Sequence, residues 1–193
     1  MAELGGTALL VLAAGLSQRF GEGSKLMAPL RGKPLGLHIA DTVAGAGFAR
    51  KLVMCRQGDA VLQAAFAGRG FEVVVNPDSG RGQASSLALG VRALARRNPK
   101  AILVCLADMP FVTMGHLETV AGALGNDMNV VASRLPAGQP SPPAAFARVH
   151  FDALTRLEGD KGARSLLASA CLIDAPAEVL ADFDTPGDFA NLG

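Results

Sequence analysis

The sequence predicts an α/β fold in three layers, with helices on both faces of a mostly parallel sheet. First, short apolar runs alternate along the chain with longer segments of helical periodicity, as in repeated β-α units. Second, the runs at 8–13, 51–55 and 101–106 are almost continuously apolar, as in parallel strands buried on both faces. Third, 193 residues with 50% hydrophobic and 18% charged residues suffice for one domain with a substantial core.

Strands are expected where the apolar runs lie, and helices in the segments between them. The expected strands cover 8–13, 51–55, 72–75, 101–106 and 129–133, with one more at 178–181. The expected helices cover 34–46, 59–68, 85–97 and 113–124, followed by two short ones at 151–157 and 163–170. Pro34 suits a first helical turn, and Ser85 and Thr113 are typical helix caps. Thr185 and Pro186 predict the start of a terminal helix.

The regular alternation ends near residue 134. Four prolines fall between Leu135 and Pro143, which predicts a loop or an extended edge there. No internal repeat and no disordered linker interrupts the chain. We therefore expect a single domain over 1–193, with a small lobe at 134–175 as the one subdivision that the pattern allows.

Composition excludes several classes of function. The formal net charge is +1 and Trp and Tyr are absent, so no nucleic-acid partner is expected. The three cysteines, Cys55, Cys105 and Cys171, lie too far apart for a zinc motif or a disulfide framework. No apolar run reaches the roughly 18 residues of a membrane span, and the N-terminus lacks the basic cluster of a signal peptide. A cytoplasmic protein with no membrane partner is expected.

A loop of small residues and two cations follows the first expected strand. Its candidate binding residues are Leu12, Ala13, Ala14, Gly15, Ser17, Arg19 and Lys25. Ligands of open parallel sheets bind beyond the carboxyl ends of the strands. Small residues let backbone N–H groups approach phosphate oxygens, and Arg19 and Lys25 neutralise their charge. The spacing fits neither a Walker loop nor the dinucleotide fingerprint. The loop therefore indicates a polyphosphate site, with an ordinary strand-to-helix connection as the alternative.

Carboxylates follow two later apolar segments. Asp108 comes directly after the run at 101–107, and Asp182 and Asp184 share one face of an extended segment because they alternate across Phe183. Magnesium takes one or two protein carboxylates together with phosphate oxygens and water. The sequence therefore offers Asp108 and either Asp184 or Asp182 as ligands of Mg²⁺, with a role at a helix start as the alternative for each.

Polar groups also stand at the start of two expected helices. Asp78 follows the third strand, and Ser85 and Ser86 follow the turn at 80–84, where hydroxyl and N–H groups suit a ribose or a base. The loop from Gly159 to Arg164 enters another helix, and its simplest interpretation is a solvated turn.

Together these segments resemble the molybdenum-cofactor nucleotidyltransferases. The resemblance is carried by Leu12-Ala13-Ala14-Gly15-x-Ser17-x-Arg19-x-Gly21 with Lys25-Leu26, Gly32-Lys33-Pro34-Leu35, Asn76-Pro77-Asp78, Ser85-Ser86-Leu87 with Gly90, Ala107-Asp108-Met109-Pro110, Gly159-Asp160-x-Gly162-Ala163-Arg164 and Asp182-x-Asp184-Thr185-Pro186-x-Asp188. These motifs run in order through nearly the whole chain. They imply the Rossmann-like, three-layer fold of the nucleotide-diphospho-sugar transferases.

Within this family the chain looks most like the molybdenum cofactor cytidylyltransferases, because Ala14 stands where guanylyltransferases tend to carry Gly. The resemblance implies Mg²⁺-dependent transfer of CMP from CTP to the terminal phosphate of molybdopterin, with release of pyrophosphate and with a molybdoenzyme or chaperone as partner. A guanylyltransferase that uses GTP is one alternative. The segment at 137–143 lacks the Gly-His that the family often has, so another acceptor such as methylerythritol phosphate is a second. A non-catalytic chaperone of the pterin cofactor is a third.

The resemblance also implies roles for the residues. Lys25, Arg19 and Asp108 are the expected catalytic residues, and Lys25 would stabilise charge at the α-phosphorus. The expected nucleotide-binding residues are Leu12, Ala13, Ala14, Gly15, Ser17, Arg19, Lys25, Asp78, Ser85 and Ser86. Asp108 and Asp184, or Asp182 instead, are expected to hold Mg²⁺, and a lobe at 134–175 would bind the acceptor.

Overall fold

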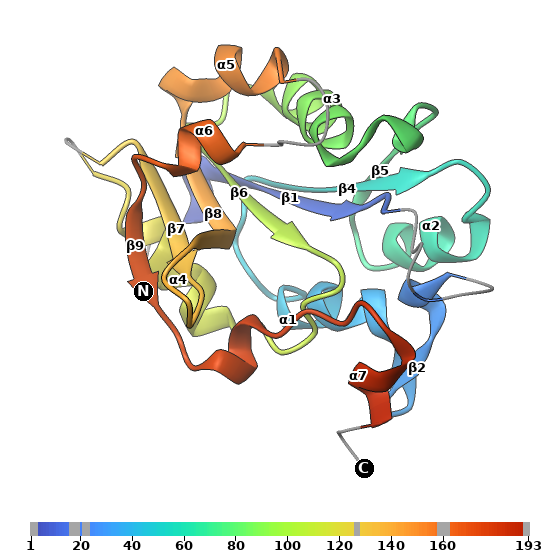
Figure 1. Cartoon of the computed structure of the whole chain (residues 1–193). Helices are drawn as coiled ribbons and strands as arrows, with labels where there is room; N and C mark the ends of the chain where they lie inside the picture. Colours follow the sequence, from blue (N-terminus) through green and yellow to red (C-terminus); the bar gives the residue numbers. More distant parts are fainter. Residues whose placement is uncertain (1–3, 16–19, 21–23, 126–127, 158–162, 191–193) are drawn as a thin grey trace.

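A seven-stranded sheet forms the centre of the molecule (Figure 1). The computed structural model describes residues 4–15, 20, 24–125, 128–157 and 163–190. Along the sheet the strands follow the order β5-β4-β1-β6-β8-β7-β9. Their bounds are Thr7–Ala13 (β1), Arg50–Arg56 (β4), Glu72–Asn76 (β5), Ala101–Leu106 (β6), Val130–Arg134 (β7), Pro140–Ala147 (β8) and Cys171–Asp174 (β9). All run parallel except β8, which is antiparallel to β6 and β7. The mostly parallel α/β sheet expected from the sequence is therefore confirmed.

Strand β1 lies in the parallel half of the sheet, between β4 and β6. Its side chains are apolar on both faces, so neither face can be exposed to solvent. All seven of its residues are buried. Leu10 is the register partner of Leu52 on β4 and of Val104 on β6. A strand so covered needs packing on both faces. The carboxyl ends of β5, β4, β1 and β6 consequently reach the same edge of the sheet, where ligands bind in folds of this class.

Helices cover both faces of the sheet (Figure 1). On one face, α3 (Gln83–Ala95), α5 (Phe151–Thr155) and α6 (Arg164–Leu167) share a core with Leu10 and Leu52. On the other, α1 (His38–Thr42), α2 (Ala60–Ala67) and α4 (Met114–Gly122) pack over Leu9 and Val11. Gly90 lets α3 lie close to β1, since a Cβ there would come within 2.6 Å of a methyl carbon of Leu10. Within the described ranges, no helix is both long and apolar enough to cross a membrane.

The proline-rich segment forms an extended edge at Pro140–Pro143, as expected, but the strand that begins there continues into the interior of the sheet. Pro140 to Pro143 pair only with β7, with a register shift between Ala132 and Ser133. Because these residues pair with no second strand, the missing proline N–H groups leave no hydrogen-bond acceptor on such a strand unsatisfied. From Ala144 the same strand continues between β6 and β7 and becomes an interior strand. Residues 134–175 thus supply β8, β9, α5 and α6 to the same sheet and cores.

Other boundaries differ from the sequence-based expectation. The expected strand at 178–181 is wrong: Ala177–Leu180 forms a 3₁₀ helix, η6, and the edge strand is β9 instead. The long helix expected at 34–46 is shorter, because Lys33–Pro34 forms strand β3 and Leu35–Leu37 a 3₁₀ turn before α1. Ser85 does not cap α3, which begins at Gln83 after Gly82. The cap at Thr113 is confirmed, since its side chain accepts a hydrogen bond from the N–H of His116 at 3.3 Å.

Candidate functional site

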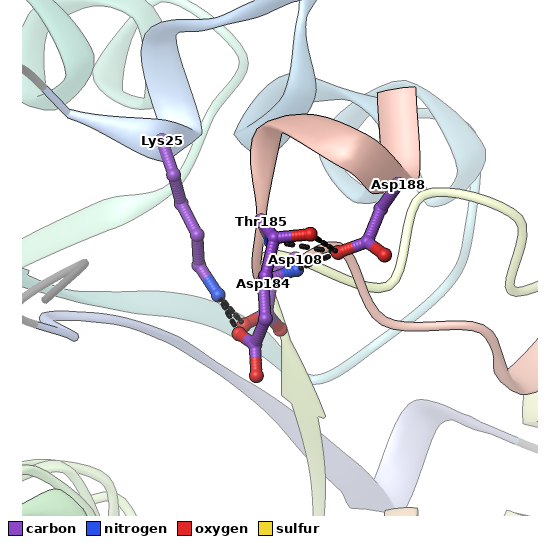
Figure 2. Close-up of polar contacts among 5 residues, drawn as sticks. All are labelled: Lys25, Asp108, Asp184, Thr185 and Asp188. Carbon is purple, nitrogen blue, oxygen red and sulfur yellow. Dashed lines mark hydrogen bonds and ion pairs between the residues drawn. The ribbon is translucent and has the colours of Figure 1, made fainter. Parts of the chain in front are cut away.

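Lys25, Asp108 and Asp184 meet at the carboxyl edge of the sheet, although 159 residues separate the first from the last. Lys25 begins the 3₁₀ turn η2 (Lys25–Met27), Asp108 follows β6, and Asp184 precedes α7 (Pro186–Ala190). The ammonium of Lys25 donates to Asp108 Oδ2 at 2.7 Å and also to Asp184 Oδ1 (Figure 2). The Lys25 side chain is 9% exposed. A buried cation thus bridges two carboxylates.

The backbone holds these three residues together. After β6, the N–H of Ala107 donates to the carbonyl of Leu12 at 3.1 Å, which ties the start of the Asp108 turn to the end of β1. The N–H of Phe183 donates to the carbonyl of Asp108, also at 3.1 Å. The C-terminal segment therefore lies across the end of β6. This is how residues from the two ends of the chain come to share one site.

The carboxylates of Asp108 and Asp184 keep Lys25 protonated, and they disfavour a further negative charge on Asp182. Burial alone lowers the pKa of Lys25, but the charges and hydrogen bonds of Asp108 and Asp184 outweigh it and the pKa stands above its ordinary value. Partial burial, followed by the charges of Asp184 and Asp108, raises the pKa of Asp182. Asp182 therefore belongs to the same electrostatic cluster, while Asp184 is the residue whose carboxylate meets Lys25.

One oxygen of this cluster has no partner. Asp108 Oδ1 is buried and makes no hydrogen bond. A buried carboxylate oxygen left in this state is costly unless a cation or donor occupies the space beside it. Among the described residues no group of three or more His, Cys, Asp or Glu side chains is arranged to hold a metal by itself. Carboxylate oxygens are ligands of hard divalent ions, which can complete their shell with phosphate oxygens and water.

Asp188 fixes the turn that carries Asp184 (Figure 2). Its Oδ2 accepts hydrogen bonds from the N–H of Asp184 at 2.8 Å and from the N–H of Thr185 at 2.6 Å, and from the Thr185 hydroxyl at 3.0 Å. These donors, the Thr185 N–H foremost, hold the pKa of Asp188 below its ordinary value. The sequence reasoning assigned no role to Asp188. The spacing Thr-x-x-Asp, which is typical of a capping box, was the available signal.

Asp78, Ser85 and Ser86 gather at the carboxyl end of β5, two strands away from β1. Buried Asn76 organises them: its side-chain nitrogen donates to Ser85 Oγ at 3.0 Å and to Ser86 Oγ at 2.9 Å, and its Oδ1 accepts from the N–H of Asp78 at 3.0 Å. Asp78 and Ser85 line a cavity of about 490 Å³ between β5 and α3, with Arg81 and Arg92 on its wall. Ser86 is 4% exposed, so Ser85 is the better placed of the two to touch a ligand.

The loop after β1 is described only in part. Leu12 and Ala13 are buried in β1, Ala14 is buried just beyond it, and Gly15 is exposed with open space where a Cβ would stand. Ser17 and Arg19 lie outside the described residues, as do 159–162. Of the expected phosphate-binding cations, Lys25 is therefore the one that the structure places, and it lies against the carboxylates.

Comparisons with known proteins extend over most of the chain. Residues 9–175 match the family of MobA-like NTP transferase domains. Purine catabolism protein PucB of Bacillus subtilis (strain 168) is 32% identical over 191 residues, which cover 92% of this chain and 91% of PucB. The bifunctional protein GlmU of Rhizobium leguminosarum bv. trifolii (strain WSM2304) is 31% identical over 136 residues, 68% of this chain but 29% of GlmU.

Among solved structures, Rv0371c of Mycobacterium tuberculosis H37Rv superimposes with a TM-score of 0.80 at 31% identity, over 96% of both chains. The complex of Rv0371c with manganese gives a TM-score of 0.75 at 29% identity, over 96% of this chain and 97% of the other. The similarity to PucB and Rv0371c thus spans almost the full length of each protein.

Proposed function

Because the chain belongs to the family of MobA-like NTP transferase domains and is a nucleotidyltransferase, we propose that it transfers CMP from CTP to the terminal phosphate of molybdopterin, with release of pyrophosphate. The observation that carries the proposal is the buried contact of Lys25 with Asp108 and Asp184 at the carboxyl edge of the sheet. A cation and two carboxylates are the groups that a phosphoryl centre and its metal ion require.

The acidic residues fit a divalent ion. Asp108 Oδ1 is buried and without a hydrogen bond, and the carboxylate of Asp184 contacts the same Lys25 ammonium as Asp108 Oδ2. Rv0371c has been crystallised in complex with manganese, which supports a divalent ion in this family. We propose that Asp108 and Asp184 hold Mg²⁺, with Asp182 as the alternative second ligand. When bound, the ion supplies positive charge that offsets the charge of the phosphate oxygens.

The chain itself supplies binding, orientation and charge. A terminal phosphate oxygen of the acceptor forms a bond to the α-phosphorus of CTP as the bond from that phosphorus to the leaving pyrophosphate breaks. The acceptor phosphate is already anionic, so no protein base is required. Lys25, displaced from the carboxylates, would donate to the α-phosphoryl oxygens as their charge grows, and Arg19 would bind the triphosphate with it.

The nucleoside would be recognised at the ends of β1 and β5. Backbone groups of Leu12 to Gly15, with Ser17, are proposed to approach the nucleotide where Gly15 leaves open space. Asp78 and Ser85, held by Asn76 at the wall of the β5–α3 cavity, are proposed to contact the ribose or base, with Ser86 behind them. Ala14 is proposed to favour cytosine, because its methyl group reduces the space available to a larger base.

Pyrophosphate release tests the proposal directly. The purified protein is incubated with Mg²⁺, with CTP or GTP, and with molybdopterin or methylerythritol phosphate. We expect turnover with CTP and molybdopterin alone. Faster turnover of GTP would make the protein a guanylyltransferase, and turnover of methylerythritol phosphate would replace the acceptor. Tight binding of molybdopterin without any turnover would favour a chaperone that delivers the cofactor to a molybdoenzyme.

A single substitution at Ala14 tests the proposed base preference. Ala14→Gly is expected to raise the rate with GTP relative to CTP. Ala145→Gly is the matched control, because Ala145 is also buried but lies in β8, away from the loop after β1. An unchanged ratio of GTP to CTP turnover in Ala14→Gly would remove Ala14 from the recognition of the base.

A further inference from the structure

Four phenylalanine rings form a continuous chain beside the site. Phe111 contacts Phe183 with ring centroids 5.6 Å apart, Phe183 contacts Phe189 at 5.2 Å, and Phe189 contacts Phe20 at 5.5 Å. All three pairs meet edge to face, at interplanar angles of 75°, 78° and 62°. Such pairs stabilise the fold by more than the burial of their apolar area alone would. We call Phe20, Phe111, Phe183 and Phe189 the aromatic chain.

Each ring comes from a segment that also carries a site residue. Phe111 lies three positions after Asp108, and Phe183 directly precedes Asp184. Phe189 follows Asp188 in α7, and Phe20 lies between Arg19 and Lys25 in the loop after β1. The guanidinium of Arg31, from the turn between β2 (Pro29–Leu30) and β3, stacks over the far end of the chain, 4.8 Å from the centre of the Phe111 ring. The rings thus connect Phe20, in the loop after β1, to both carboxylate segments.

Phe189 is the ring whose position depends most on these contacts. It touches Phe20 on one side and Phe183 on the other, and it lies in a helix of five residues. A helix of that length is not stable by itself and takes its position from tertiary contacts. The Asp188 hydrogen bonds fix the start of α7, and Asp184 just before it contacts Lys25. The Phe189 ring adds a contact from α7 itself to Phe20 in the loop after β1.

We propose that Phe189 is a positioning residue that holds Phe20, five residues before Lys25, against the carboxylate segments. It touches neither substrate nor metal. Phe183 is 3% exposed and packs in the core, and the two ring contacts of Phe189 link Phe20 to that position. The inference deepens the proposed function, on which its nucleotide readout rests.

The test compares two Phe→Leu variants that each remove a ring from an edge-to-face pair. Phe189→Leu acts on the aromatic chain. Phe71→Leu is the matched control, because Phe71 meets Phe66 edge to face at 5.1 Å and packs in the core beside α2. We expect Phe189→Leu to raise the KM for CTP about tenfold and to weaken binding of Mn²⁺ alone severalfold, with little loss of Tm. Phe71→Leu is expected to lower Tm and leave both constants unchanged.

Phe189→Tyr keeps the ring and is expected to restore wild-type constants. The proposal is overturned when Phe189→Leu matches wild type in both constants, or when Phe71→Leu changes them equally, since the ring would then act through stability alone. Mn²⁺ binding separates the two proposals: weaker Mn²⁺ binding by Phe189→Leu in a protein that does not use CTP would support the positioning role and reject the proposed substrate.

Discussion

Replacing Lys25 by Met removes the cation that both Asp108 and Asp184 contact. Methionine is close to lysine in length and keeps most of the apolar contacts of the stem. The change therefore isolates the charge. The two carboxylates then lose the cation that they share, and Asp108 already has an oxygen without a hydrogen bond.

The expected cost follows from the exposure of each partner. Breaking a buried ion pair by removing one partner costs about 3–5 kcal/mol, because the other charge stays buried without compensation. Asp108 is 20% exposed, so the loss of its pair with Lys25 is expected to cost about 3 kcal/mol, the lower limit of this range. Asp184 is 39% exposed, so its pair with Lys25 counts as a surface pair of about 0–1 kcal/mol. We expect Lys25→Met to lose about 3 kcal/mol in the free energy of unfolding, or about 6–12 °C in Tm.

A divalent ion is expected to reverse this loss. In the wild type the ion must displace Lys25 from the two carboxylates, whereas in Lys25→Met it meets them without a competitor. We expect the variant to bind Mn²⁺ on the order of 10–100-fold more tightly than the wild type in the absence of nucleotide. At 100 times its dissociation constant, the ion stabilises the folded state by about 2.7 kcal/mol. Transfer activity is still expected to fall by about 10²-fold or more, because no cation then faces the α-phosphorus.

Urea unfolding with EDTA, followed by a Mn²⁺ titration, measures both effects. Lys33→Met is the matched control, because Lys33 also pairs with a carboxylate, Asp41 Oδ2 at 2.6 Å, but is 37% exposed. Its expected cost is at most about 1 kcal/mol, with no change in Mn²⁺ affinity. Equal stability of Lys25→Met and wild type in EDTA, or equal Mn²⁺ affinity, would refute the reasoning from the Lys25 contacts.

Three further predictions concern the same edge of the sheet and the core beside it. Asp108→Ala is expected to abolish transfer and to weaken Mn²⁺ binding while far-UV circular dichroism stays unchanged, and turnover near the wild-type rate in excess Mg²⁺ would remove Asp108 as a ligand. Asp188→Ala removes three hydrogen bonds at the start of α7 and is expected to cost about 1 kcal/mol, with faster amide exchange at 184–189 as the local readout; unchanged exchange would show that α7 is held without this cap. Burial lowers the pKa of His116, whose Nε2 donates to Ser133 Oγ at 2.7 Å since that hydroxyl donates to the carbonyl of Pro143. The stability that neutral His116 contributes is complete above the unfolded pKa of 6.5, and it is lost as the pH falls from there towards the lowered folded pKa. His116→Gln is therefore expected to lose less stability than wild type between pH 7.5 and pH 5.5 in urea unfolding. An equal loss would contradict this.

The parallel half of the fold could be predicted because its signals are local. The apolar runs of β1, β4 and β6 are continuous, and a strand of this composition has to be buried on both faces wherever the rest of the chain lies. Thr113 caps α4 for a reason that involves only the three residues after it. The prolines correctly predicted an extended edge at Pro140–Pro143, but the interior part of β8 from Ala144 onwards was not predicted, because the prolines mark only where pairing on one side stops.

The candidate site could be predicted as a set of residues but not as an arrangement. The motifs named Lys25, Asp108 and Asp184, and the rule that ligands bind at the carboxyl ends of parallel strands placed all three at one edge. The sequence assigned Lys25 to the phosphates and the carboxylates to a metal ion. It gave no indication that Lys25 would contact both carboxylates, because contacts over 83 and 159 residues depend on how the loops pack.

The sequence by itself determined the class of fold, the family and the residues at the ends of the strands, since periodicity, apolar runs and motif spacing are properties of neighbouring residues. Only the tertiary structure decided that the C-terminal segment crosses the end of β6, that Asp184 rather than Asp182 meets Lys25, and that four rings join the three segments of the site. The physical reason is that burial and close packing select among many arrangements of the same side chains, and that selection acts on distances in space, which spacing along the chain does not specify.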